Sequence, residues 1–482
     1  MQRAAIQRIL GILLMIISVS MLPPILVSYW YGDGATMPFF LAFLSTLIAG
    51  LLLWLPVKSF KKEMRLRDGF IVVAMYWLVL GLSGSLPLIL SATPALSITD
   101  AVFESMSGLT TTGATVITGL DDLPKSILYY RQQLQWLGGM GIIVLAVAIL
   151  PMLGIGGMQL YRAETPGPMK DNKLTPRITE TAKALWYIYL GLTIACALAY
   201  WAAGMSAFDA IGHSFSTVAI GGFSTHDASI GYFNSAAIEM VAVVFMILAG
   251  VNFSLHFLAW RNISLKPYFA DSEFKVYIKV LILVALITSM YLYITGTYMG
   301  WDAIHNGVFQ AVSIGTTTGF TTAEYHNWPG FLPALLLLAS FIGGCAGSTG
   351  GGMKVIRILL LFKQGMREVV RLIHPNAQVL VKVGGQVLEE RVIDAVWGFF
   401  SLYVVSFTIM ALLLAASGLD LVTAFSAVAA CMNNLGPGLG DVGSHYGDIN
   451  DIAKWILCFA MLLGRLEIFT LLVLLTPAFW RK

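Results

Sequence analysis

The chain has 482 residues, of which 57% are hydrophobic and only 11% are charged, whereas soluble globular proteins carry roughly 25% charged residues. Apolar runs of about 18 residues or more recur along the whole length, as in polytopic membrane proteins. These properties exclude a soluble enzyme with one anchor, a disordered chain and a nucleic-acid-binding protein. The net charge of +3 says little about a polyanionic partner.

Ten apolar runs can each cross a hydrocarbon core of about 30 Å. In chain order they lie near residues 6–31, 37–57, 69–93, 128–153, 182–204, 234–260, 275–299, 330–361, 393–417 and 452–480. The first run is too long for the core of a signal peptide, so we expect it to remain in the chain. The expected fold class is therefore an all-α polytopic membrane protein with ten transmembrane helices.

The basic residues predict how the chain is oriented, because Lys and Arg accumulate in short cytoplasmic loops. Here they precede the first run, crowd the second, fourth, sixth and eighth connections, and end the chain at Arg481 and Lys482. The exceptions are Lys125, Arg131 and Lys454 on the opposite side and Arg465 inside the last run. Both termini are therefore expected to be cytoplasmic.

Four shorter helical segments lie between expected spans on the non-cytoplasmic side, and each runs into a cluster of Gly, Thr and Ser. The segments are expected to begin at Asp100, Asp209, Asp302 and Asp420, where a carboxylate can cap the helix start. The clusters centre on Gly113, Gly222, Gly319 and Gly436. Ser107, Ser216 and Ser313 each precede their glycine by six residues, while the fourth segment has Ala430 there.

This spacing of roughly 100 residues indicates an internal repeat. We expect two extra N-terminal spans and four parallel repeats of helix, short helix and helix around a pseudo-four-fold pore. The corresponding ranges are residues 1–67, then 68–153, 154–262, 263–392 and 393–482.

Irregular backbone at membrane depth is tolerated only where it is buried in protein or lines a water-filled path. Four such loops around one axis can replace the hydration shell of an ion with backbone carbonyls. The partly negative C-terminal ends of the short helices favour a cation. The alternative is that the loops are tight turns, with glycine present for positive φ or close packing.

Several motifs together resemble the Trk/Ktr/HKT superfamily of potassium transporters, closest to its bacterial TrkH subunits. They are Thr-Thr-Thr-Gly113-Ala, Ala-Ile-Gly-Gly222-Phe, Thr-Thr-Thr-Gly319-Phe, Asn-Asn-Leu-Gly436-Pro-Gly, the stretch Gly343 to Lys354 and Gly464-Arg465-Leu-Glu467. Nearly the whole chain takes part, and the two extra N-terminal spans are also similar to TrkH. The resemblance implies K⁺ uptake, with Rb⁺ as a second permeant ion, across the bacterial inner membrane. It further implies a homodimer with one pore per protomer and a cytosolic TrkA-like nucleotide-binding ring.

The resemblance also implies a K⁺ selectivity filter with one glycine per repeat. Its expected residues are Thr111, Thr112 and Gly113; Ile220, Gly221 and Gly222; Thr317, Thr318 and Gly319; and Asn434, Leu435 and Gly436. In the plant relatives, glycine at the position of Gly113 goes with potassium permeation and serine with sodium preference.

The eighth run contains six glycines within ten residues, with Ser348 and Thr349 between them: Gly343, Gly344, Gly347, Gly350, Gly351 and Gly352. Because each glycine costs about 1 kcal/mol of helix propensity, a continuous helix is not expected here. The resemblance implies an intramembrane gating loop that includes Lys354. Close helix packing through small residues is the alternative, and the stretch lacks the spacing of a phosphate-binding P-loop.

Arg465 lies near the middle of the last run, where an unpaired guanidinium costs at least about 2.5–3.5 kcal/mol. It is expected either to act at the gate, by bonding the glycine-rich loop or raising a barrier to cations, or to form a structural pair with a carboxylate such as Glu467.

Two other functions compete with a gated pore. An enzyme finds little support, because the seven histidines form no metal-binding or nucleophile motif. A secondary transporter that couples K⁺ to H⁺ or Na⁺ by alternating access is the stronger alternative, although such proteins often contain inverted repeats, whereas these repeats are parallel. No organic cofactor is expected.

Overall fold

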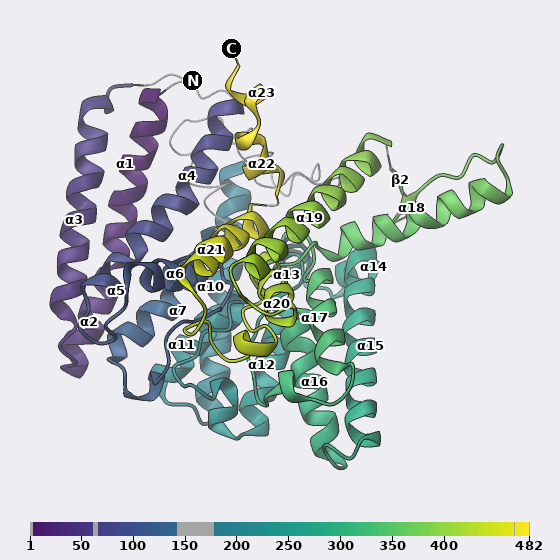
Figure 1. Cartoon of the computed structure of the whole chain (residues 1–482), viewed down its shortest axis with the longest axis horizontal. Helices are drawn as coiled ribbons and strands as arrows, with labels where there is room; N and C mark the ends of the chain where they lie inside the picture. Colours follow the sequence, from purple (N-terminus) through teal and green to yellow (C-terminus); the bar gives the residue numbers. More distant parts are fainter. Residues whose placement is uncertain are drawn as a thin grey trace.

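The computed structural model describes residues 3–60, 66–141, 178–384, 386–388, 390–466 and 468–481. This part of the chain is almost entirely helical (Figure 1), which confirms the all-α polytopic membrane fold. Its strands are β1 (Lys382–Val383) and β2 (Gln386–Val387), which pair antiparallel.

Six helical segments in the described residues are long and apolar enough to cross a membrane, and each coincides with an expected run. They are α1 (Arg3–Ser20) with α2 (Leu22–Tyr31), α3 (Thr36–Trp54), α4 (Leu66–Gly84) with α5 (Leu86–Leu90), α10 (Ile178–Ala202), α15 (Ser272–Ile294) and α19 (Glu390–Ala416). Figure 1 places the start of α1 and the short helix α23 (Pro477–Trp480) at the same end of the molecule.

The N-terminal helices α1 and α3 pack closely because glycines face each other. A Cβ added to Gly11 would lie 2.8 Å from the carbonyl oxygen of Gly50, and one added to Gly50 would lie 2.9 Å from that of Gly11. Small residues let membrane helices approach in this way. This hairpin packs through α1 against α4.

Of the other four runs, the fourth is described only as far as residue 141, and the sixth, eighth and tenth each contain more than one helix. Their helices are α7 (Lys125–Met140), α12 (Ala236–Ala249) with α13 (Phe253–Asn262), α17 (Leu332–Ile342) with α18 (Val355–Ile373), and α21 (Asp451–Arg465) with α22 (Phe469–Leu475) and α23 (Pro477–Trp480). The break between α17 and α18 is the glycine-rich one that the sequence predicts. The end of the fourth run, from residue 142, lies outside the described residues.

The sixth and tenth runs are bent or broken within their length, a detail that the sequence does not indicate. Helices α12 and α13 meet at an angle of 94°, because Asn252 begins α13 as its N-cap and accepts a hydrogen bond from the backbone N–H of Ser254 at 2.8 Å. In the last run, α21 ends at Arg465, and Ile468 has a φ of 57°, which a continuing helix cannot contain.

Four short, largely buried helices lie between the longer ones (Figure 1). They are α6 (Ile98–Leu109), α11 (Ala207–Val218), α16 (Trp301–Gly315) and α20 (Leu421–Met432). The remaining short elements of the described residues are α14 (Lys266–Ala270), η1 (Leu55–Val57), η2 (Leu120–Asp122), η4 (Ser229–Phe233), η5 (Tyr325–Asn327) and η6 (Gly440–Val442).

The caps of the short helices differ from the expected ones. Only Asp420 is itself an N-cap, and it accepts the backbone N–H of Val422 and Thr423. In α6 and α11 the caps are Ser97 and Ser206, each three residues before its aspartate. Each serine hydroxyl accepts the N–H of its aspartate and donates to its carboxylate, as in a capping box. Helix α16 begins after Gly300, with Asp302 in its first turn.

Candidate functional site

All four short helices end in the same backbone motif. In each, the N–H of the residue before the glycine donates at 2.8 Å to the carbonyl six residues before the glycine, on Ser107, Ser216, Ser313 or Ala430. This is the 6→1 bond of a Schellman motif. Because only the carbonyl takes part, Ala430 serves as well as serine, which explains how the fourth segment keeps the geometry.

Two residues of each loop have left-handed backbone. The glycines Gly113, Gly222, Gly319 and Gly436 have φ of 81°, 79°, 83° and 100°. The residues two positions earlier, Thr111, Ile220, Thr317 and Asn434, have φ of 52°, 55°, 69° and 52°. Three of these are β-branched, for which positive φ is unusual and costs of order 1–3 kcal/mol. Such strain persists where the surroundings enforce it, and it is typical of functional sites.

The four loops form a closed ring, since each glycine contacts the next loop. A Cβ on Gly113 would lie 2.1 Å from the carbonyl oxygen of Gly221, and one on Gly222 would lie 2.1 Å from that of Thr318. A Cβ on Gly319 would lie 2.2 Å from the carbonyl oxygen of Leu435, and one on Gly436 would lie 2.7 Å from that of Thr112. The contacts therefore run through all four loops and return to the first.

Side-chain hydroxyls and amides stiffen this ring. Thr110 with Thr112, and Thr316 with Thr318, form hydroxyl pairs at 2.7 Å. Asn434 joins the fourth loop to the first by donating from Nδ2 to Oγ1 of Thr112 at 3.0 Å. The twelve residues that the sequence predicts for the filter thus lie together in the structure.

The second loop has no threonine at the positions of these pairs and is held instead by Gln135 of α7. The Nε2 of Gln135 donates to the carbonyl of Gly221 at 2.6 Å, and its Oε1 accepts the N–H of Phe223 at 3.0 Å. One turn earlier, Gln132 donates to the carbonyl of Phe223 at 3.2 Å. These contacts make α7 part of the support of the ring, a role that our sequence analysis missed.

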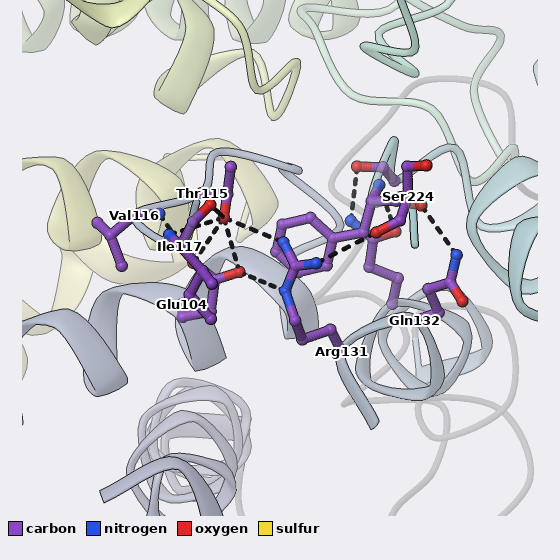
Figure 2. Close-up of polar contacts among 10 residues, drawn as sticks. Glu104, Thr115, Val116, Ile117, Arg131, Gln132 and Ser224 are labelled. Atoms are coloured by element: carbon purple, nitrogen blue, oxygen red, sulfur yellow. Dashed lines mark hydrogen bonds and ion pairs between the residues drawn. The ribbon is translucent and has the colours of Figure 1, made fainter. Parts of the chain in front are cut away.

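A buried ion pair joins the first and second loops (Figure 2). The Nε of Arg131 lies 2.7 Å from Oε1 of Glu104, and their side chains are 1% and 0% exposed. Arg131 also donates to the carbonyl of Ser224 and the hydroxyl of Thr115, while Glu104 accepts the N–H of Val116. The guanidinium carbon lies 4.3 Å from the centre of the Phe223 ring. The pair thus fixes the backbone after both glycines.

Replacing Arg131 with glutamine should lower the free energy of unfolding by about 3–5 kcal/mol, because it leaves the carboxylate of Glu104 buried without its ion partner. Chemical unfolding in detergent micelles measures this loss. The double variant Glu104→Gln with Arg131→Gln should recover part of the stability, because no unpaired charge remains. A loss below about 1 kcal/mol in the single variant would mean that the pair does not hold the loops together.

A second link between the first two loops lies beyond the ring. His226 contacts the carboxylate of Asp121 through Nδ1, and its Nε2 lies 3.6 Å from Oδ1 of Asp209. Its ring stacks on Tyr232 with 3.5 Å between the centroids. Burial alone would lower the pKa of His226, but the carboxylates of Asp209 and Asp121 outweigh burial and raise it.

The raised pKa predicts a pH-dependent stability. The contribution of His226 is fully present below its ordinary pKa of about 6.5 and is lost as the pH rises through the raised value. Melting temperature should therefore fall over this interval, and His226→Gln should flatten the profile. His374, which follows α18 and is exposed, provides the control variant His374→Gln. An unchanged profile in His226→Gln would contradict the link.

The glycine-rich loop between α17 and α18 lies directly against the ring. The N–H of Gly351 donates to Oγ1 of Thr317 at 2.7 Å, and the N–H of Gly352 donates to the carbonyl of Asn433 at 3.0 Å. A Cβ on Gly351 would lie only 1.9 Å from that carbonyl oxygen. Glycine is therefore required here by the close approach of the loop to the end of α20.

The rest of the loop is tied to neighbouring helices and to itself. Thr349 donates to the carbonyl of Val218 at 2.9 Å, and Gly347 accepts the N–H of Phe253 at 3.0 Å. Within the loop, Ser348 donates to the carbonyl of Cys345 and Lys354 donates to that of Gly350. At its ends, the N–H of Gly343 bonds to Ala339 and the carbonyl of Gly344 accepts the N–H of Val355.

Arg465 is buried and contacts this loop, since its Nη1 donates to the carbonyl of Thr349 at 3.2 Å. The contact that the sequence predicts between Arg465 and the glycine-rich loop is therefore present. Its suggested partner Glu467 lies outside the described residues. A cavity of about 50 Å³ is lined by the loop, by Asn434 and by three basic side chains, Lys354, Arg357 and Arg465.

The family model for TrkH, described as a cation transport protein, matches residues 35–482. The chain belongs to the TrkH family. It is 61% identical over 477 residues to the Trk system potassium uptake protein TrkH of Halomonas elongata, and the match covers 99% of each chain. It is 57% identical over 479 residues to TrkH of Escherichia coli K12, again over 99% of each chain.

The crystal structure of the potassium transporter TrkH from Vibrio parahaemolyticus matches 100% of both chains with a TM-score of 0.92 at 58% identity. The resemblance that the motifs indicate is thus confirmed. TrkH-family relatives are named as transport proteins rather than enzymes, so the expectation that this chain is not an enzyme is confirmed as well. Membership of the TrkH family and the apolar spans identify a multi-pass membrane protein.

Proposed function

We propose that this TrkH-family chain takes up K⁺ through a pore lined by the four glycine loops. The single observation that carries the proposal is the closed ring, in which the glycine of each loop contacts the carbonyl preceding the glycine of the next. The names of the relatives as potassium uptake proteins support K⁺ as the transported ion, with Rb⁺ as a substitute.

The ring suits a dehydrated cation for two reasons. The glycine of each loop lies against a backbone carbonyl of the next loop. Several carbonyl oxygens are therefore close enough together to replace the water around one ion. The C-terminal ends of four helices meet at these loops, and each carries a partial charge of roughly −0.5. Both effects favour a monovalent cation over an anion.

The loop from Gly343 to Gly352 is proposed to be the gate. It packs against Thr317 and Asn433 at the ring, where it would obstruct the path. Lys354, Arg357 and Arg465 line the adjoining cavity, and their charges would oppose a cation that leaves the ring. Moving the loop and Arg465 together would remove both obstacles, which is the step we assign to a cytosolic TrkA-like nucleotide-binding ring.

We assign the outer face of α18 to a homodimer with one pore per protomer. This helix projects from the body of the protein (Figure 1) and exposes a set of large apolar side chains. They are Phe362, Met366, Val369, Leu372 and Ile373. A second copy would cover them, and we propose the basic connection from Lys363 to Arg391 as one contact with the regulatory ring. The other candidate contact, residues 154–177, lies outside the described residues.

The proposed location is the bacterial inner membrane, with both termini in the cytoplasm. The distribution of Lys and Arg supports this orientation, and the start of α1 and helix α23 lie at the same end of the molecule (Figure 1). The four repeats and the two N-terminal spans are proposed with the ranges given above.

Ion-replacement electrophysiology on the purified protein, with and without the regulatory ring, tests the proposal. It predicts unitary K⁺ and Rb⁺ currents that need no H⁺ or Na⁺ gradient and increase with the ring in its activating nucleotide state. Flux limited to one ion per conformational cycle, with a fixed H⁺ or Na⁺ stoichiometry, would instead indicate a symporter.

A further inference from the structure

Glu273 is hydrogen-bonded at both ends of the glycine-rich loop. Nothing in the sequence connects this residue with the gate. It is the second residue of α15, and its side chain is only 8% exposed. Its Oε1 accepts the backbone N–H of Ala346 at 2.7 Å and that of Ile356 at 3.1 Å. One carboxylate oxygen therefore holds both ends of the segment from residue 347 to residue 355.

A carboxylate is well suited to this task. Its oxygens are acceptors with more than one lone pair each, so a single oxygen can accept two backbone N–H groups at once. Asp271, the N-cap of the same helix, accepts the N–H of Phe274 at 2.7 Å, so Glu273 is not required as the cap. Its two bonds serve the loop rather than α15.

The loop is thus held in two places. Its middle is held to the ring through Gly351 and Gly352 and to α11 through Thr349, while its base is held by Glu273. If the loop moves as proposed, the contacts at the ring must break, but the bonds at the base can remain. A fixed base would make the intervening residues move as one unit and return to the same closed position.

We infer that Glu273 is the positioning residue of the gate. Its hydrogen bonds keep the two ends of the loop together while the middle of the loop moves. The inference rests on the gate proposed above. It predicts that loss of the carboxylate loosens the closed loop without disturbing the ring.

The test combines ion flux with site-resolved thiol labelling of the dimer in vesicles without the regulatory ring. Rb⁺ uptake should rise in Glu273→Ala and rise less in Glu273→Gln, which keeps an acceptor oxygen. Cys345 lies within the loop base and is buried, as are the other cysteines, Cys196, Cys431 and Cys458. Labelling of Cys345 alone should accelerate by about tenfold or more, because the backbone N–H groups of Ala346 and Ile356 lose their acceptor.

Two further variants test the positioning role of Glu273 separately from the gate itself. Asp271→Asn removes a charge two residues away but keeps a good N-cap, so flux and labelling should match the unmodified protein. Gly351→Ala forces the loop away from Asn433 and should raise flux whether or not Glu273 positions the loop. If Gly351→Ala raises flux and Glu273→Ala does not, the positioning role of Glu273 is contradicted, whereas the loop is still supported as the gate. If neither variant raises flux, both the gate and the positioning role of Glu273 are contradicted. Equal acceleration at all four cysteines in Glu273→Ala would also overturn the positioning role of Glu273, because it indicates general unfolding.

Discussion

Gly113→Ser is expected to lower K⁺ flux at least tenfold and to raise the Na⁺/K⁺ permeability ratio several-fold. A Cβ at this position would lie 2.1 Å from the carbonyl oxygen of Gly221, so the first and second loops must separate by more than 1 Å to reach an ordinary contact. The left-handed backbone at φ 81° also costs roughly 1–2 kcal/mol for serine, because serine has a Cβ. A wider ring with displaced carbonyls coordinates K⁺ less well and discriminates less between ions.

Gly119 provides a matched control for this variant. It follows the same loop and has a φ of 71°, but a Cβ there would meet nothing within 4 Å. Gly119→Ser therefore carries the same backbone cost without the contact, and its permeability ratio, measured from reversal potentials in mixed Na⁺ and K⁺, should be unchanged. Equal ratios in Gly113→Ser and the unmodified protein would remove this position from the selectivity argument.

The second large effect is expected at Arg465. Replacing it with alanine removes both a positive charge beside the path and the hydrogen bond to Thr349. Basal Rb⁺ flux into vesicles without the regulatory ring should therefore rise about tenfold, since a bond to a charged group contributes about 1.5–3 kcal/mol.

Arg465→Lys distinguishes the two contributions, because lysine keeps the charge but loses the planar guanidinium. Flux near that of the unmodified protein would assign the effect to charge, and flux near that of the alanine variant would assign it to the hydrogen bond. Lys279→Ala removes an exposed positive charge from α15 and should leave flux unchanged. Unchanged flux in a folded Arg465→Ala protein would reject a role at the gate.

Much of the site could be predicted from the sequence because its signals repeat. One Gly/Thr cluster would be ambiguous, but four at similar spacing predict four loops at one axis, and the contacts from Gly113 round to Gly436 place them there. The glycines from Gly343 to Gly352 predict the interruption of the eighth run for a similar reason, since no helix accommodates so many. Burial of Arg465 against protein followed from the cost of an isolated charge in a membrane.

The parts that could not be predicted depend on single contacts without a repeated pattern. The 94° bend before Phe253 depends on the N-cap Asn252, and Asn is common in many other contexts. Glu104 and Arg131 are 27 residues apart in the chain, so only the fold brings them together. A signal was present at α7, where Arg131, Gln132 and Gln135 interrupt an apolar run on adjacent turns. Polar residues at such depth indicate a buried or functional face.

Anomalous diffraction from crystals of the dimer grown in Rb⁺ or Tl⁺ tests the central claim most directly. The ring predicts a strong peak on the axis shared by Gly113, Gly222, Gly319 and Gly436, within coordination distance of carbonyls from all four loops. Its intensity should fall in Gly113→Ser crystals and persist in Gly119→Ser crystals. A transport-competent protein whose only ion peaks lie away from these loops would contradict the claim.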